Sequence, residues 1–211
     1  VPPLIWSLDE VDRLFTYPFG SDVFSLFRSW HNRRALDPTG PWRSLTLAMT
    51  YATEAHLFIS DLNQSPFNIG TRLTLHDFSL TQVAELNRRY GTPLQTESEV
   101  ARLYELLSGH PYLTQKSLVE MATRGLDIHR LEAQSDRNDG LFGDHLRRLL
   151  ASLTQDARLT AVVRARLQGE QDLAEADFYR LRSAGVLTGD TAFEAYWRCP
   201  VYRTYLQRHL L

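Results

Sequence analysis

The sequence predicts an α/β region built on a parallel sheet over residues 1–78, followed by an all-α region. Two observations lead to this fold class. Before residue 78, short apolar runs that end in charged or turn-forming residues alternate with a helical segment, a pattern typical of parallel sheets. From Ser79 onward, apolar residues recur at the spacing of amphipathic helices. We divide the second region at a polar stretch, which gives three domains: 1–78, 79–140 and 141–211.

The first domain begins with an apolar run, PLIWSL at residues 3–8, which is followed by Asp9 and Glu10. A short apolar run bounded by charge is typical of a strand that is buried on both faces. The other elements expected in this domain are a helix over 22–35 and strands over 42–49 and 72–75.

Helix-capping signals divide the second domain. Ser79 with Gln82, and Thr96 with Glu99, match the capping box, in which the first and fourth residues exchange hydrogen bonds. Glycines follow the first two helices, where a residue with positive φ is favoured. The expected helices are 80–90, 97–108 and 111–125, and the turn-forming stretch 134–140 ends the domain.

The third domain has the element order of a winged helix-turn-helix, which is three helices followed by a small hairpin. Gly185 ends the third helix, and a Thr-Gly-Asp turn precedes an apolar and aromatic strand. The expected elements are helices 142–152, 156–168 and 173–184, strand 193–197 and a closing helix 200–211.

The composition is that of a folded globular protein. The 211 residues are 43% hydrophobic and 23% charged, with a net charge of −2, which argues against a disordered chain and a general polyanion-binding protein. The sequence has no apolar run near the roughly 18 residues that span a bilayer and no signal-peptide pattern. We therefore expect a cytoplasmic protein with no membrane segment. Cys199 is the single cysteine and is expected to be a packing residue.

The strongest chemical signal is the pair of acids after the first strand. Ligands of open α/β sheets bind at the carboxyl ends of the strands, where Asp9 and Glu10 are expected to lie. Nucleotide hydrolysis needs one carboxylate there to hold Mg²⁺ and a second to polarise the attacking water. A strand end with a helix-capping Asp explains the same residues without a ligand.

Six segments carry a resemblance to a known family: LIWSLDEVDRLF, SWHNRRA, PWRSLTLAMTYATEAHLFISDLNQSPFNIG, LTLHDFSLTQVAELNRRYG, SGHPYL and FGDHLRRLL. In this order they resemble the bacterial AAA-like ATPases of the STAND class, P-loop proteins that act as signalling switches. The resemblance covers nearly the whole chain. It implies a partial P-loop NTPase (AAA-like) parallel-sheet core with a Walker B motif over 1–78, a helical lid over 79–140 and a winged-helix domain over 141–211.

The resemblance also implies ATP and Mg²⁺ as ligands and assigns roles to individual residues. Asp9 matches the Walker B acid associated with Mg²⁺, and Glu10 matches the acid that orients the hydrolytic water. Thr50 or Thr53, after the second strand, matches the polar sensor of the γ-phosphate, and the choice between the two stays open.

A second element of the family lies in the predicted lid. Gly109, His110 and Pro111 match its Gly-x-Pro element, which the resemblance places near the adenine and the base of the nucleotide. A helix stop followed by a proline-started helix explains the same three residues equally well.

The sequence lacks one element that the resembling family needs in order to bind ATP. A P-loop needs GxxxxGK[ST] to cradle the phosphates, and no Gly-Lys pair occurs in the sequence. The single lysine, Lys116, follows Gln115 in a predicted helix. In the resembling fold the P-loop strand pairs inside the sheet, so we expect this strand to come from an upstream segment or another chain. The alternative is that the remaining strands have rearranged.

The first functional hypothesis is a switch ATPase module in which ATP bridges core and lid and thereby sets the position of the winged helix. The alternatives are a non-hydrolysing module that binds only protein, and a winged-helix DNA-binding regulator. We rank DNA last, because Asp172, Glu175 and Asp177 at the start of helix 173–184 would repel phosphates. A protein partner is expected on the winged helix. A homo-oligomer is a further option, in which Arg33 or Arg34 would act as an arginine finger.

Overall fold

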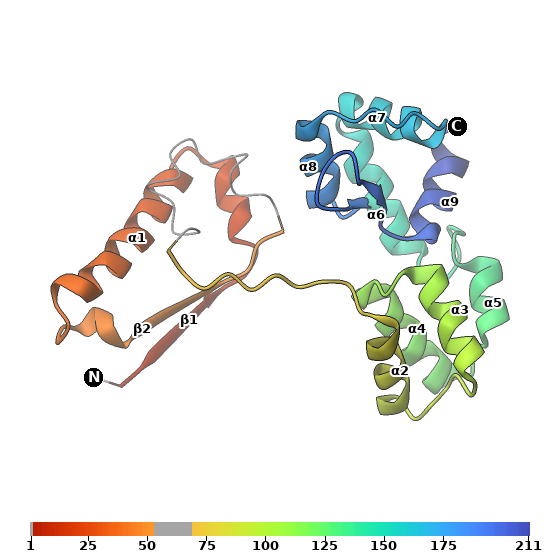
Figure 1. Cartoon of the computed structure of the whole chain (residues 1–211), viewed down its shortest axis with the longest axis horizontal. Coiled ribbons are helices and arrows are strands. Elements are labelled where there is room, and N and C mark those ends of the chain that lie inside the picture. Colours follow the sequence, from red (N-terminus) through yellow and green to blue (C-terminus); the bar gives the residue numbers. More distant parts are fainter. Residues whose placement is uncertain (1, 53–68) are drawn as a thin grey trace. The chain divides into compact units, whose positions relative to one another are not determined.

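The computed structural model describes residues 2–52 and 69–211, which are mostly helical with two small two-stranded sheets. The chain forms two compact units, residues 1–74 and 75–211, and each is described by itself (Figure 1). In the described part of the chain, no helix is long and apolar enough to cross a membrane.

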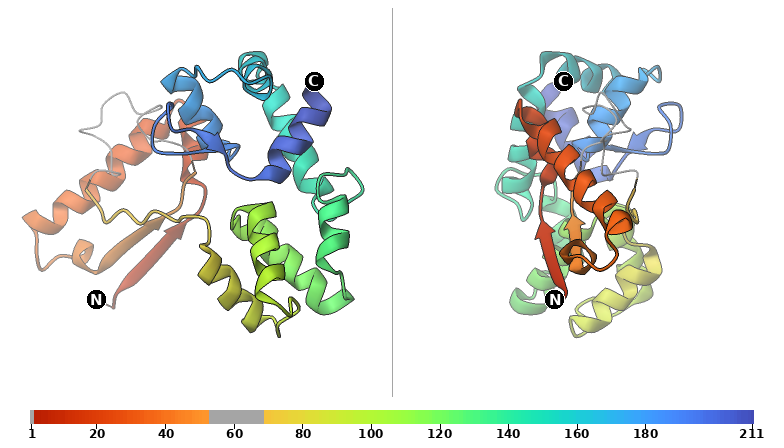
Figure 2. Two further views of the ribbon diagram at one scale, coloured as in Figure 1. Left: turned by 45° about the vertical axis from the view of Figure 1, so that its right-hand side comes forward. Right: turned by 90° about the vertical axis from the view of Figure 1, so that its left-hand side faces the viewer.

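The first unit contains a parallel strand pair joined through a helix. Strand β1 (Leu4–Leu8) lies beside β2 (Leu45–Met49) in parallel orientation (Figure 2). In the register of this pair, Leu8 lies opposite Met49. The connection between the strands contains the 3-10 helix η1 (Val11–Thr16), the helix α1 (Gly20–Leu36) and the 3-10 helix η2 (Pro41–Ser44). These elements confirm the strand-helix-strand order predicted for residues 3–49.

Helix α1 covers one face of this strand pair. Phe24 and Phe27 of α1 are buried together with Val11. The ring of Trp6 on β1 lies 6.2 Å from the rings of both Phe27 and Trp30. Side chains alternate across a strand, so residues next to Trp6 face away from the helix. Ile5 accordingly is 70% exposed.

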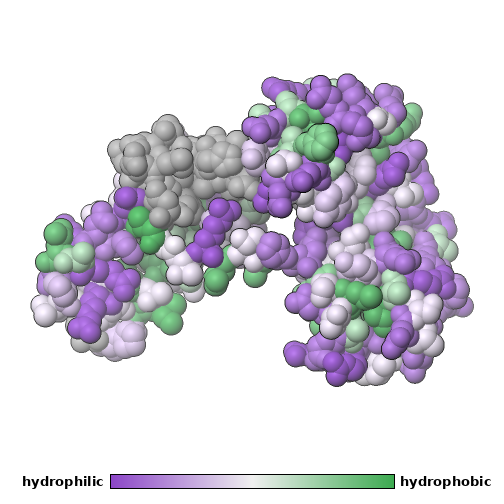
Figure 3. Space-filling view, viewed as in Figure 1, coloured by the Kyte–Doolittle hydropathy of each residue, from purple (hydrophilic) through white to green (hydrophobic). Residues whose placement is uncertain are grey.

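Two predictions about the sheet are wrong. Residues 3–8 are not buried on both faces, since Leu4 is 60% exposed and Trp6 is 43% exposed. Residues 72–75 are exposed and form no strand. Within the described residues, α1 packs on only one face of the strand pair, so side chains of β1 stay exposed. Residues 72–75 pair with neither β1 nor β2, and a strand needs a neighbour to satisfy its backbone groups. The space-filling view shows hydrophobic residues at the surface of this unit (Figure 3).

The second unit is built from eight helices and a short hairpin among its described residues. The hydrogen bonds of both predicted capping boxes are present, at Ser79 and Gln82 and at Thr96 and Glu99. The structure adds a helix that was not predicted, α5. The elements are α2 (Leu80–Arg89), α3 (Glu97–Leu107), α4 (Pro111–Arg124), α5 (Ile128–Gln134), α6 (Gly143–Thr154), α7 (Ala157–Leu167), α8 (Glu175–Ser183), β3 (Leu187–Thr188), β4 (Tyr196–Trp197) and α9 (Pro200–Leu210).

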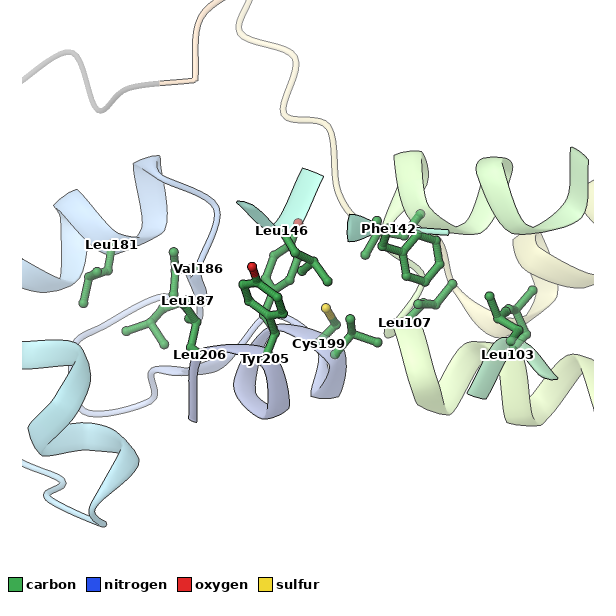
Figure 4. Close-up of a cluster of buried hydrophobic side chains, with 14 of the residues drawn as sticks. Leu103, Leu107, Phe142, Leu146, Leu181, Val186, Leu187, Cys199, Tyr205 and Leu206 are labelled. Atoms are coloured by element: carbon green, nitrogen blue, oxygen red, sulfur yellow. The ribbon is translucent and has the colours of Figure 1, made fainter. Parts of the chain in front are cut away.

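A single hydrophobic core runs through the second unit. It extends from Leu103 and Leu107 on α3, through Phe142, to Leu181 on α8 (Figure 4). Helix α9 packs against α3, α6 and α7 and against β4. The last helix of the chain therefore contacts helices that precede residue 140 and helices that follow it.

Candidate functional site

Two of the predicted site residues meet at the carboxyl end of the strand pair. Strands β1 and β2 are parallel and in register from Leu4 to Leu8, so the residues that follow them, Asp9 and Thr50, leave the sheet side by side. The register continues past the strands, because the amide of Thr50 donates to the carbonyl of Leu8 over 3.0 Å. The parallel sheet itself places these two side chains together.

A hydrogen-bond cluster joins the two residues. The hydroxyl of Thr50 donates to Oδ1 of Asp9. The amide of Glu10 lies 3.1 Å from Oδ1 of Asp9 and 3.1 Å from Oγ1 of Thr50. The amide of Val11 donates to the carbonyl of Thr50 over 3.0 Å. Of the two threonines that the sequence offered, Thr50 contacts Asp9, and Thr53 lies outside the described residues.

Glu10 joins this cluster through its backbone. It has φ 52° and ψ 44°, the left-handed conformation that residues with a Cβ rarely adopt. Its carboxylate pairs with Arg13, with 2.7 Å between Oε2 and Nη2. Both side chains of this pair are largely solvent-exposed, so the contact contributes little stability and the carboxylate can change partner readily.

The chemistry of this cluster fits Mg²⁺. Mg²⁺ prefers oxygen ligands and is usually bound through one or two carboxylates together with substrate phosphates and water. Asp9 offers a carboxylate and Thr50 a hydroxyl oxygen, and both side chains are exposed at the end of the strands. Phosphates would need a separate cradle, because the sequence has no Gly-Lys pair.

The predicted lid element, Gly109, His110 and Pro111, lies in the second unit. Gly109 has φ +72°, and a Cβ at this position would lie 1.9 Å from the carbonyl oxygen of Phe78. The amide of Phe78 donates to the carbonyl of Gly109 over 2.8 Å. Pro111 occupies the first turn of α4, as expected for a proline-started helix. The glycine is thus required both by conformation and by the close approach of a second chain segment.

The side chain of His110 points into the protein. It is 6% exposed, and its Nε2 lies 2.8 Å from the hydroxyl of Tyr202. Burial, helped by the positive charge of Arg198, lowers the pKa of His110 to about 4. The imidazole is therefore neutral near pH 7 and acts as a hydrogen-bonding group of the interior.

Sequence reasoning missed four residues around this turn. Asp77 and Arg198 form a two-pronged ion pair, with Nε–Oδ2 at 2.9 Å and Nη2–Oδ1 at 2.6 Å. The hydroxyl of Tyr202 lies 2.7 Å from Nε2 of His145 as well as contacting His110. No local pattern could have identified these pairs, because their members are between 57 and 121 residues apart in the chain.

The acids at the start of α8 are only partly at the surface. Asp172 and Glu175 are exposed, but Asp177 is 5% exposed and pairs with Arg158 of α7 over 3.0 Å. The expectation that all three acids face a passing phosphate is therefore wrong for Asp177. Its position at the N-terminal turn of a helix favours a negative charge and explains why this acid is tolerated inside.

A family model described as AAA-like domain matches residues 1–208. The uncharacterized WD repeat-containing protein slr0143 of Synechocystis sp. (strain ATCC 27184 / PCC 6803 / Kazusa) is 33% identical over 132 residues, which are 61% of this chain. The chain matches 11% of the length of that relative. No solved structure matches the chain.

Proposed function

Because the chain belongs to the AAA-like domain family, we propose that it is part of an ATP-binding signalling switch of the STAND class. In this proposal the end of the β1–β2 pair holds the Mg²⁺ that accompanies a nucleoside triphosphate. The contact between Thr50 and Asp9 carries the proposal. It supports the assignment because it joins Asp9, the proposed Walker B acid, to the polar residue that follows the neighbouring strand, which is the position proposed for the γ-phosphate sensor.

Each residue of the cluster has a separate role in the proposed reaction. Asp9 would bind the metal, and Thr50, whose single hydroxyl proton is donated to Asp9 in this structure, would turn that proton to the terminal phosphate when nucleotide binds. Mg²⁺ would neutralise negative charge on the β- and γ-phosphates. Glu10 would orient the attacking water after its carboxylate leaves Arg13. The exposed ion pair of Glu10 and Arg13 is weak enough to allow this change of partner.

The open sheet supports a second part of the proposal. We propose that a phosphate-binding segment with the pattern GxxxxGK[ST], from the same protein or another chain, adds a strand to the sheet. The added strand would pair with the backbone edge of the strand pair, near the exposed residues Leu4, Ile5 and Trp6. Added strand hydrogen bonds would satisfy backbone groups that the β1–β2 pair leaves open.

The second unit would act as the responding part. Residues 79–140 would form the lid, and residues 141–211 a winged helix that binds protein. The order α6, α7, α8, β3, β4 supports the winged-helix assignment. The exposed acids Asp172 and Glu175 still weigh against DNA as the ligand.

A paired measurement of binding and turnover tests the proposal. The protein should contain a phosphate-binding segment together with residues 1–211. Glu10→Gln should bind Mg²⁺-ATP as tightly as the wild type but hydrolyse it on the order of 100-fold more slowly, because it removes only the group that activates water. Glu97→Gln, an exposed substitution on α3, is the matched control and should change neither quantity. A protein without affinity for ATP would refute the proposal.

A non-hydrolysing protein-binding module is the second candidate. The missing Gly-Lys pair and the exposed apolar residues of β1 favour it. It predicts that the same protein binds no nucleotide at any Mg²⁺ concentration, whereas the first candidate predicts Mg²⁺-dependent binding.

A further inference from the structure

The Tyr202 hydroxyl joins two parts of the second unit. It lies between Nε2 of His110, at the start of α4, and Nε2 of His145 on α6. In the described chain, Nδ1 of His110 is buried without a hydrogen-bond partner. The Tyr202 hydroxyl can donate one hydrogen bond and accept another, so it can serve both imidazoles at once. Tyr202 thereby links the start of α4 to α6.

A second set of contacts involves Asp77 and Phe78, near the start of the second unit. Asp77 accepts both hydrogen bonds of the Arg198 fork, and both side chains are more than two-thirds buried. Two-pronged ion pairs of this kind are stronger and more specific in direction than ordinary hydrogen bonds. The neighbouring residue, Phe78, is hydrogen-bonded to Gly109. Residues 77–78 are therefore held by the lid turn on one side and by Arg198, two residues before α9, on the other.

Further along α9, two more side chains bind the stretch that was expected to separate the two domains. The hydroxyl of Tyr205 donates to Oδ1 of Asn138 over 2.8 Å. Arg208 pairs with Asp136 at 2.5 Å. We call the contacts of Arg198, Tyr202, Tyr205 and Arg208 the α9 anchor. Together with the continuous core in Figure 4, the anchor joins helices that precede residue 140 to helices that follow it.

We infer that residues 77–211 move as one body, which the α9 anchor holds together, so that the lid and the winged helix do not separate when the switch changes state. The inference rests on the proposed function for its nucleotide response, but the rigidity of the unit does not depend on it. Any conformational change driven by nucleotide would then take place in the part of the chain that precedes Asp77. There, residues 69–76 are without regular secondary structure and mostly exposed. A displacement of the Gly-His-Pro turn would then move the winged helix with it, because His110 contacts Tyr202 of α9.

Distances between paired spin labels test this inference. One pair replaces Arg88 on α2 and Ala161 on α7, and a second pair replaces Ser29 on α1 and Ala161, all by cysteine at exposed positions. Cys199 stays unlabelled in the folded protein, because it is buried and burial raises the pKa of its thiol to about 12.

Without nucleotide, we expect one narrow distance distribution for the Arg88–Ala161 pair in the wild type. The double variant Arg198→Gln with Tyr202→Phe should broaden it, whereas the exposed control Arg203→Gln with Tyr196→Phe should not. A melting curve establishes that both variants remain folded. A broad or two-peaked distribution in the wild type would overturn the inference whatever the nucleotide does.

In the protein that also contains a phosphate-binding segment, Mg²⁺-ATP or Mg²⁺-ADP should leave the Arg88–Ala161 distance constant while the Ser29–Ala161 distribution changes. A nucleotide-dependent shift of the Arg88–Ala161 pair would place a joint inside the unit and contradict the inference. Failure to bind nucleotide would count against the proposed function alone, and the nucleotide-free distributions would still decide the rigidity of residues 77–211.

Discussion

Replacing Gly109 by alanine should lower the free energy of unfolding of the second unit by about 3–6 kcal/mol. The left-handed conformation at φ +72° costs about 1–2 kcal/mol once a Cβ is present. The new Cβ would lie 1.9 Å from the backbone oxygen of Phe78, so one segment must move. That movement breaks the Phe78–Gly109 hydrogen bond, which is worth about 1 kcal/mol. The remaining overpacking adds about 1–3 kcal/mol.

Gly91→Ala provides the matched control. Gly91 has φ +81°, but its position for a Cβ has no atom within 4 Å. Gly91→Ala should therefore lower the free energy of unfolding only by the cost of the left-handed conformation, about 1–2 kcal/mol. Urea unfolding followed by far-UV circular dichroism measures both variants, because most of the helix lies in the second unit. Equal losses for the two variants would refute the argument that the Gly-His-Pro turn is pressed against residues 77–78.

Two further predictions concern buried charge in the second unit. The pKa of His110 is about 4 in the folded state and roughly 6.5 in the unfolded state. As the pH falls, the unfolded chain therefore takes up this proton at a higher pH than the folded protein does. Stability should therefore fall as the pH is lowered from about 6.5 to 4, by up to about 3 kcal/mol, and His110→Gln should flatten this slope in urea midpoints measured at several pH values. Parallel slopes for the two proteins would show that His110 is not buried as a neutral group. Arg158→Gln should cost about 1–2 kcal/mol, since Asp177 would stay buried without its partner, while Glu175→Gln at the exposed start of α8 should change the urea midpoint within error.

Local sequence signals were sufficient for most of the elements. The capping boxes at Ser79 and Thr96 specify the starts of α2 and α3 through hydrogen bonds within four residues. The apolar run before Asp9 predicts β1, and the parallel pairing of β1 with β2 explains why Asp9 meets Thr50. This part of the candidate site depends only on where two neighbouring strands end.

The rest depends on partners that are distant in the chain. Residues 72–75 have the composition of a strand, yet they pair with neither β1 nor β2, and composition alone cannot supply a neighbour. Asp77 and Arg198 are 121 residues apart, so their ion pair exists only because α9 returns to the lid helices. Asp177 appears surface-like in the sequence for the same reason, since its partner Arg158 lies on a different helix.

The most direct test of the central claim is the Mg²⁺ dependence of ATP affinity in a protein that joins a phosphate-binding segment to residues 1–211. Calorimetric titrations with and without Mg²⁺ should show an increase in affinity of at least about tenfold, equivalent to 1.4 kcal/mol, in the wild type and in the exposed control Asp190→Asn. Asp9→Asn should lose this Mg²⁺-dependent increase in affinity, and Thr50→Ala should reduce it. The control Thr46→Ala, on β2, should retain it. A full Mg²⁺-dependent increase in Asp9→Asn would contradict the assignment of the metal site to the end of β1 and β2.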